Sequence, residues 1–152
     1  MRRTYRLVVR IALARRAYAS PVPAARPKHL VLILASEFAS NLATPMLIVD
    51  AEGMLIFFNE AAEEVLGGTF AELGEMSIDE FSARAAPRLE NDDPLPQERR
   101  PTRIAFDERR AAHETMTITS LDGAERHVGV TAFPLFAQKD EFVGIVVIWW
   151  RE

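Results

Sequence analysis

The segment from Pro45 to Gly67, PMLIVDAEGMLIFFNEAAEEVLG, constrains the fold of this chain more than any other. An apolar run ends at Asp50, a turn follows through Gly53, and a second apolar run stops at Asn59. After Asn59 the apolar residues recur at helical spacing, with acidic residues between them. This order predicts a strand, a tight turn, a second strand and a helix capped by Asn59. Such a unit forms a small concave sheet with a helix across its mouth, which suits ligand sensing better than catalysis.

Helices are expected both before and after this unit. The stretch from His29 to Leu42 carries apolar residues at helical spacing. This helix must end before Pro45, because the residue preceding a proline is pushed out of the helical region. Thr69 and Ser77 each precede a glutamate by three residues, which is the pattern of a capping box. Further helices are predicted over 69–73, 77–84 and 102–110.

The last third of the chain changes from helical to strand periodicity. Apolar residues alternate with threonines over 114–120, which is typical of a half-buried strand. The dipeptide Asp122–Gly123 then marks a hairpin turn. Further strands are predicted over 126–136 and 142–150. Because short connections make neighbouring strands antiparallel, the sequence predicts an α+β fold.

Three of the predicted strands contain the unbroken apolar runs MLIV, MLIFF and GIVVIWW. An antiparallel sheet with one solvated face alternates apolar and polar residues, so both faces of this sheet must be covered. The short helices would cover one face, and the 29–42 helix, alone or with the same helix of a second copy, would cover the other. We therefore expect a homodimer. The candidate interface residues are Leu30, Leu34, Phe38, Leu42, Trp149 and Trp150.

Length, cysteine content and charge narrow the class of protein. A chain of 152 residues can form one domain with a substantial core. The absence of cysteine excludes disulfides, thiolate metal sites, cysteine nucleophiles and cysteinyl cofactor adducts, and favours a reducing cytoplasm. Residues 1–28 carry eight basic side chains and no acidic one, which leaves ten basic against all 22 acidic side chains elsewhere. This asymmetry indicates an acidic folded domain behind a basic leader, and no nucleic-acid partner.

The basic leader is predicted to be a disordered extension. The apolar stretches in its first 16 residues, Leu7–Val9 and Ile11–Ala14, are too short for a secretory signal or for the roughly 20 apolar residues of a membrane span. The alternative is an amphipathic segment lying on an anionic membrane surface. Three prolines before His29 indicate a hinge. The expected organisation is a leader over 1–28, a capping and dimerisation helix over 29–44, and the main domain over 45–152.

Three further groups of residues are candidate sites. The acidic loop Glu90–Asp93 lacks the regular spacing and glycine of a calcium loop, so a solvated loop is expected. Arginines at 99, 100, 103, 109 and 110 form a basic band that is expected to pair with nearby acids, or else to dock an acidic partner. No serine lies in a glycine-framed nucleophile turn, and no glycine loop could cradle phosphate. The sequence therefore predicts no catalytic residue and no metal site.

These features together resemble the PAS domain family, the sensory module of many bacterial signalling proteins. The resemblance covers residues 37–151. It is carried by Pro45–Asp50, Gly53, Phe57–Ala62, Leu66–Gly67, Leu121–Gly123, Pro134–Leu135 and Val143–Val147. It implies a five-stranded antiparallel sheet with short helices across one face, here with the N-terminal helix covering the other face. It also implies a pocket between sheet and helices. The implied pocket residues are Phe58, Ala62, Leu66, Phe81, Phe106 and Phe133.

The departures from the family pattern limit the expected function. Without cysteine the chain cannot form a cysteinyl flavin adduct, and His29, His113 and His127 do not lie on a pocket helix, where a haem ligand is usual. The cofactor is otherwise left open. The resemblance implies a single-domain, non-enzymatic sensory or interaction module that binds a small apolar ligand and acts through a second copy or a signalling partner. The alternatives are a ligand-free adaptor with a self-filled pocket and a small-molecule enzyme of related shape.

Overall fold

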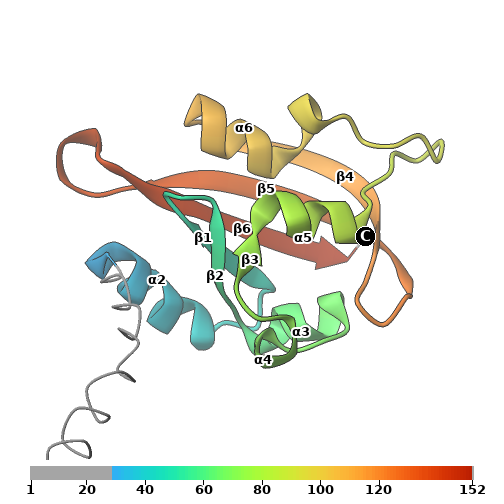
Figure 1. Cartoon of the computed structure of the whole chain (residues 1–152), viewed down its shortest axis with the longest axis horizontal. Helices are drawn as coiled ribbons and strands as arrows, with labels where there is room; N and C mark the ends of the chain where they lie inside the picture. The colour runs from blue at the N-terminus through green and yellow to red at the C-terminus, as the bar shows by residue number, and fades with distance from the viewer. Residues whose placement is uncertain (1–28, 152) are drawn as a thin grey trace, which may run out of the picture.

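A single curved sheet with helices on both sides forms the core of residues 29–151, which the computed structural model describes (Figure 1). Within these residues the sheet has six strands in the order β3-β2-β1-β6-β5-β4, and every neighbouring pair is antiparallel. The strands are β1 (Met46–Asp50), β2 (Met54–Phe58), β3 (Met76–Ser77), β4 (Ala112–Thr119), β5 (Glu125–Phe136) and β6 (Phe142–Arg151). The α+β prediction is confirmed, and the leader over 1–28 lies outside the described residues.

The predicted helices are present with small changes at their ends. They are α2 (Leu30–Ser40), α3 (Glu60–Leu66), α4 (Phe70–Leu73), α5 (Ile78–Ala85) and α6 (Pro101–Glu108). Two short 3₁₀ turns, η1 (Gln97–Arg99) and η2 (Gln138–Asp140), complete the described elements. The prediction of five strands is wrong by one, because β3 is only two residues long and gives no periodic signal in the sequence. It pairs with the start of β2 and leads directly into α5.

The local sequence signals explain why the elements begin and end where they do. The Asp50 side chain accepts hydrogen bonds from the backbone of Glu52 and Met54, at 3.0 and 2.9 Å, and so holds the β1–β2 turn. The Asn59 side chain accepts from Ala62 N–H at 3.0 Å and begins α3. Gly67 ends α3 in the left-handed conformation with φ of 70°, which favours glycine. The capping box before α4 and the serine cap of α5 are also present, as predicted.

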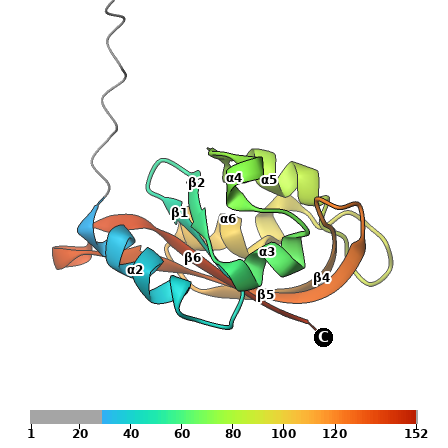
Figure 2. The same ribbon diagram turned by 90° about the horizontal axis from the view of Figure 1, so that it is seen from below.

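The helices divide into two layers. Figure 2 shows α2 on one side of the sheet and α4, α5 and α6 on the other. The inner layer, between the sheet and α3–α6, contains most of the buried side chains, including Leu47, Leu55 and Ile145. The outer layer lies between the sheet and α2, and its buried members include Leu32, Ile48 and others. The N-terminal helix thus covers the second sheet face, as the apolar strands required.

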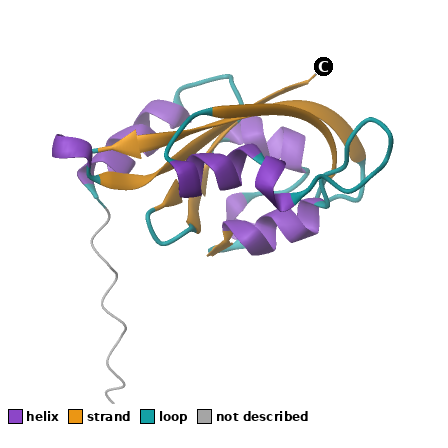
Figure 3. Cartoon of the chain, turned by 90° about the horizontal axis from the view of Figure 1, so that it is seen from above, coloured by secondary structure: helices purple, strands orange, loops and turns teal. Residues whose placement is uncertain are grey.

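The outer layer covers only part of that face. α2 packs on β1, β2 and β6, whereas the outer face of β4 carries threonine and histidine side chains. Figure 3 shows how strongly the long strands curve. Gly144 of β6 pairs with Asp50 of β1, and its φ is 152°. A side chain there would collide with the backbone oxygen of Val49, so glycine is required at this point of the β1–β6 pairing.

Candidate functional site

An apolar cavity of about 50 Å³ lies in the inner layer between α5, α6 and the sheet. Phe81 from α5 and Trp149 from β6 line it, and their ring centroids are 6.5 Å apart. Its polar lining comes from Ser82, Arg100 and Thr102. A cavity that holds benzene in a protein core measures about 150 Å³, so the space here is small.

Of the six predicted pocket residues, the structure brings Phe81 to this cavity and distributes the others. Phe58, Ala62 and Leu66 are buried in the inner layer, at the end of the sheet that α3 covers, and do not line the cavity. Phe58 instead packs edge-on against Phe70 of α4, with ring centroids 5.3 Å apart.

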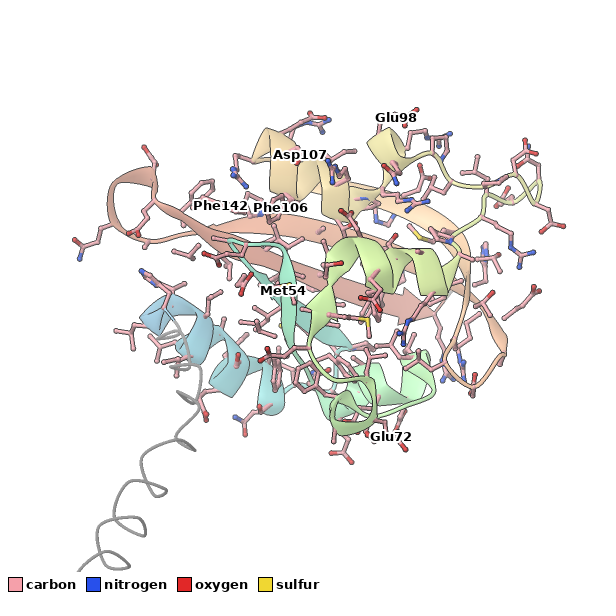
Figure 4. All side chains as sticks on the ribbon, viewed as in Figure 1. Met54, Glu72, Glu98, Phe106, Asp107 and Phe142 are labelled. Atoms are coloured by element: carbon pink, nitrogen blue, oxygen red, sulfur yellow. The ribbon has the colours of Figure 1, made fainter. Side chains whose placement is uncertain are left out.

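Phe106 and Phe133 lie elsewhere. Phe106 packs edge-on against Phe142, with ring centroids 5.5 Å apart, where α6 meets β6 (Figure 4). The prediction that Phe133 faces the pocket is wrong, because its partner in the register is Val146 and both side chains belong to the outer layer. Its β5 neighbour Ala132 faces the inner layer instead.

A polar groove of about 120 Å³ adjoins the apolar cavity. It lies between the β1–β2 turn, the start of α5 and the start of α6, and Phe106 forms part of its wall. The groove and the cavity share four lining residues. These are Ile78, Ser82, Arg100 and Thr102. The two spaces therefore meet at these side chains, and the sequence reasoning missed this junction because its members come from α5 and from the start of α6, which are separated in the sequence.

Arg100 is fixed at this junction by neutral acceptors. Its Nε donates to the backbone oxygen of Leu95 at 3.2 Å, and one terminal nitrogen donates to Ser82 Oγ at 3.0 Å. The side chain is partly buried. Within residues 29–151 no carboxylate lies within ion-pair distance of it. A guanidinium held in this way keeps three N–H donors for another acceptor.

The outer face of α2 is a second unusual surface. Leu32 and Ala39 hold the helix to the sheet with 4% and 0% exposure. On the opposite side, Leu30, Leu34 and Phe38 are 64%, 59% and 65% exposed. Ile33, at 43%, and the charged Glu37 complete this side of α2, and we call these five residues the α2 stripe.

The structure divides the remaining predicted interface residues. Leu42 is partly buried and packs against the outer layer of its own chain. Trp149 was expected at the interface, and that expectation is wrong, because its side chain is 4% exposed and belongs to the inner layer. Trp150 points to the outer face, where it lies over Gly129 and stacks on His113 with ring centroids 5.0 Å apart. It stays 40% exposed.

The side chain of Asn59 joins the two layers. It donates to the backbone oxygens of Ala39 and Thr44, both at 2.9 Å, and accepts from the backbone of Met46 at 3.0 Å. It also caps α3 through Ala62, and it is 3% exposed. One buried amide therefore fixes the end of α2, the start of β1 and the start of α3.

The charged groups in the described part of the chain do not gather as metal ligands would. No cluster of three or more histidine and acidic side chains that could hold a metal occurs there. A backbone hydrogen bond and the hydroxyl of Thr69 lower the pKa of Glu72, and Arg126 lowers the pKa of Asp122 to about 2. Neither carboxyl lines the cavity or the groove. Of the helices in residues 29–151, none has the length and apolar character needed to cross a membrane.

Comparison with known proteins identifies the family. A family model described as PAS domain matches residues 43–149. No curated protein matches the chain. The structure resembles the PAS domain of Bordetella pertussis BvgS, with 18% identity, a TM-score of 0.54 and coverage of 80% of this chain and 85% of that one. The PAS domain of nitrogen regulation protein NR(II) from Vibrio parahaemolyticus has 19% identity, a TM-score of 0.53 and coverage of 78% and 98%.

A third similar structure is that of a dimer. The light-state dimer of the fungal blue-light photoreceptor Vivid has 10% identity and a TM-score of 0.59, with coverage of 86% of this chain and 99% of that one. At these identities the three structures establish the fold alone.

Proposed function

The chain belongs to the PAS domain family, and we propose that it is a non-enzymatic sensory and interaction module that works as a homodimer through α2. The observation that carries this proposal is the α2 stripe, with three large apolar side chains more than half exposed. Fully burying an aliphatic or aromatic side chain contributes about 1.5–3 kcal/mol. An exposed row of this kind is therefore a favourable contact surface.

A second copy of α2 is the occupant that suits the stripe best. A twofold contact brings the same patch of both chains together, so the patch must be complementary to itself. The α2 stripe meets this condition because its apolar side chains can pack on their equivalents, with Glu37 as its one charge. The light-state dimer of Vivid supports the idea that PAS folds can associate. A signalling partner that presents an apolar helix is the alternative occupant.

We propose that the signal enters through the inner cavity and reaches α2 through Asn59. A ligand can shift an equilibrium only by its differential affinity for two arrangements. Movement of the inner helices would change the position of α3, whose first turn is bonded to Asn59. The same amide holds the end of α2 through Ala39. Ligand binding and association are thereby linked through one buried side chain.

The lining of the cavity itself supports a non-enzymatic role. Among the described residues the cavity has two hydroxyls and one arginine as its polar lining, and none of these is paired with a carboxylate or histidine. Catalysis by proton transfer needs such a group within hydrogen-bond reach of the substrate. We further propose that the module acts in a bacterial cytoplasm, which the lack of cysteine favours.

The ligand-free adaptor is the second candidate, and the small size of the cavity favours it. A space of about 50 Å³ is close to what the surrounding side chains could fill by small movements. Native mass spectrometry of the purified protein would separate the candidates. A retained small molecule supports the sensor, whereas protein without bound mass in either oligomeric state favours the adaptor.

The experiment that tests the homodimer is light scattering coupled to size-exclusion chromatography. Phe38→Glu and Leu34→Glu each place a charge in the stripe, so we expect the monomer mass from both variants and the dimer mass from the wild type. Leu121→Glu is the matched control, since Leu121 is also a partly exposed leucine, at 39%, but lies in the β4–β5 turn. A monomeric wild type, or Phe38→Glu with unchanged dimer mass, would overturn the α2 interface.

A further inference from the structure

We propose that the groove and the cavity together bind a small monocarboxylate, with its acid group on Arg100 and its short apolar tail beside Trp149. This inference rests on the proposed sensory function, because it names the class of ligand. The two spaces meet at Ser82, Arg100 and Thr102, so one molecule could occupy both. The polar groove would then hold the charged end and the apolar cavity the hydrocarbon end.

Arg100 differs from the other arginines of the basic band. Arg99 pairs with Glu114 at 2.7 Å, and Arg103 pairs with Asp107 at 2.6 Å. Those two arginines are exposed, whereas Arg100 is partly buried and makes hydrogen bonds only to neutral oxygens in the part of the chain that the structure describes. A partly buried guanidinium without an acid is costly, and a bound carboxylate would remove that cost.

The surroundings of Arg100 add donors in the same place. The hydroxyls of Ser82 and Thr102 line both spaces. Arg100 also immediately precedes α6, which begins with Pro101 and has no side-chain cap, so the N–H groups that follow Pro101 in the first turn have no capping side chain. The positive end of the helix dipole then favours an anion here. A carboxylate at this point would meet the guanidinium, a hydroxyl and the helix start together.

The acidic residues of the groove define the charge of the ligand. Glu52 and Asp79 also line it, and Asp79 is paired with Arg103 at 3.5 Å. Among the described residues that line the groove, Arg100 is the cation without a carboxylate partner, so the groove can match one acid group and a monoacid fits better than a diacid. The tail must enter a cavity of about 50 Å³. Because benzene needs about 150 Å³, a chain of about three carbons fits and an aromatic ring does not.

The test is a titration of the full-length protein with butyrate, followed by ¹H–¹⁵N NMR spectra, with butyramide as the uncharged probe of matched shape. We expect butyrate to shift the amide signals around α5 and α6 and to bind at least ten-fold more tightly than butyramide. Arg100→Gln should weaken butyrate at least ten-fold. Arg99→Gln is the matched control, because Arg99 lines neither space, and it should leave butyrate affinity unchanged.

A second variant tests the tail and covers the case in which Arg100→Gln fails to fold. Ala85 lines the cavity, so Ala85→Leu should fill it and abolish butyrate binding while Arg100 stays in place. Equal binding of butyramide, unchanged affinity in a folded Arg100→Gln, or full binding to Ala85→Leu would each overturn the proposal. Light scattering on the same samples reports dimerisation separately. A monomer that binds butyrate would contradict only the proposed α2 interface. A dimer that does not bind butyrate would contradict only the proposed carboxylate site.

Discussion

The two faces of the sheet differ in how completely helices of the same chain cover them. On the inner face, four helices from the same chain cover the strands, and side chains such as Leu47 and Ile145 are completely buried. On the outer face, one helix covers β1, β2 and β6, and its own far side is apolar and exposed. The inner layer is complete within one chain. The outer layer ends in a surface that a further chain would complete.

The strand sequences explain this difference. β4 alternates, so Met116 and Ile118 face the inner layer while Thr117 faces outward, and this part of the outer face needs no cover. β1 and β6 carry apolar residues on both sides, so α2 must cover Ile48 and Val146. The alternation of apolar and polar residues therefore decides which part of the outer face α2 covers and which part is left uncovered.

The adjacent tryptophans of β6 give the largest contrast between the faces. Trp149→Ala would open a cavity beside Phe81 and should lower the free energy of unfolding by about 4 kcal/mol. Trp150→Ala is the matched control on the outer face. It removes a partly exposed ring and a stack on His113, and should cost about 1 kcal/mol. Urea unfolding measures both, and equal losses would refute the distinction between a complete and an incomplete face.

Asn59 tests the connection between the layers. Asn59→Ala removes an amide that is 3% exposed and leaves the backbone groups of Ala39, Thr44 and Met46 without their side-chain partner. Each buried polar group that loses its partner costs about 1–3 kcal/mol, and water can reach some of these, so we expect a loss of about 3 kcal/mol. Thermal unfolding measures it.

A matched control for the Asn59 link is the N-cap of α5. Ser77 accepts one hydrogen bond, from Glu80 N–H at 3.1 Å, and touches a single helix. Ser77→Ala should therefore cost about 1 kcal/mol. If both variants lose the same amount, Asn59 acts as an ordinary helix cap and does not join the layers.

Much of the fold could be predicted because its signals are local. The turn after Asp50 and the helix cap at Asn59 each depend on a few consecutive residues, and both are confirmed. The need to cover both faces also followed from unbroken apolar runs. The family resemblance is confirmed by the match over residues 43–149.

The facing of individual side chains could not be predicted from the same runs. In GIVVIWW every residue is apolar, so nothing in the sequence tells which tryptophan points inward, and Trp149 was assigned to the wrong face. Phe133 was misplaced for the same reason, since it precedes Pro134 in an apolar stretch. Arg100 looked like one member of a solvated band. Its isolation from acids depends on distances between elements that the sequence does not contain.

Gly129 tests how the side chains pack on the part of the outer face that α2 does not cover. A side chain here would collide with the indole of Trp150, which lies directly over the glycine. Gly129→Ala should therefore lift Trp150 from the sheet, separate it from His113 and cost about 1 kcal/mol. The fluorescence of Trp150, measured in the Trp149→Phe background, should report greater solvent exposure. Gly123→Ala is a poor control because its φ is 81°, so Thr119→Ala, on the same face but away from Gly129, serves instead. An unchanged spectrum would show that Trp150 does not rest on Gly129.

The smallest expected effect concerns the turn that closes the inner layer. Hydrogen bonds from Arg126 and from the Ala124 backbone lower the pKa of Asp122 from 3.8 to about 2, so the folded state favours the charged carboxylate. A carboxyl with a lowered pKa stabilises the fold above its unfolded value, and that contribution disappears as the pH falls through about 2. Asp122→Asn should therefore be less stable than the wild type at pH 6, and the difference in urea midpoints should shrink between pH 4 and pH 2. Because the Asp122 side chain is 41% exposed, the effect should be small and should weaken further in high salt.

In the Arg126→Gln background the pH dependence should be reduced. If it persists there unchanged, the guanidinium is not its cause, and this turn then contributes to the inner layer through backbone contacts such as Leu121 N–H to Leu66 O at 2.6 Å.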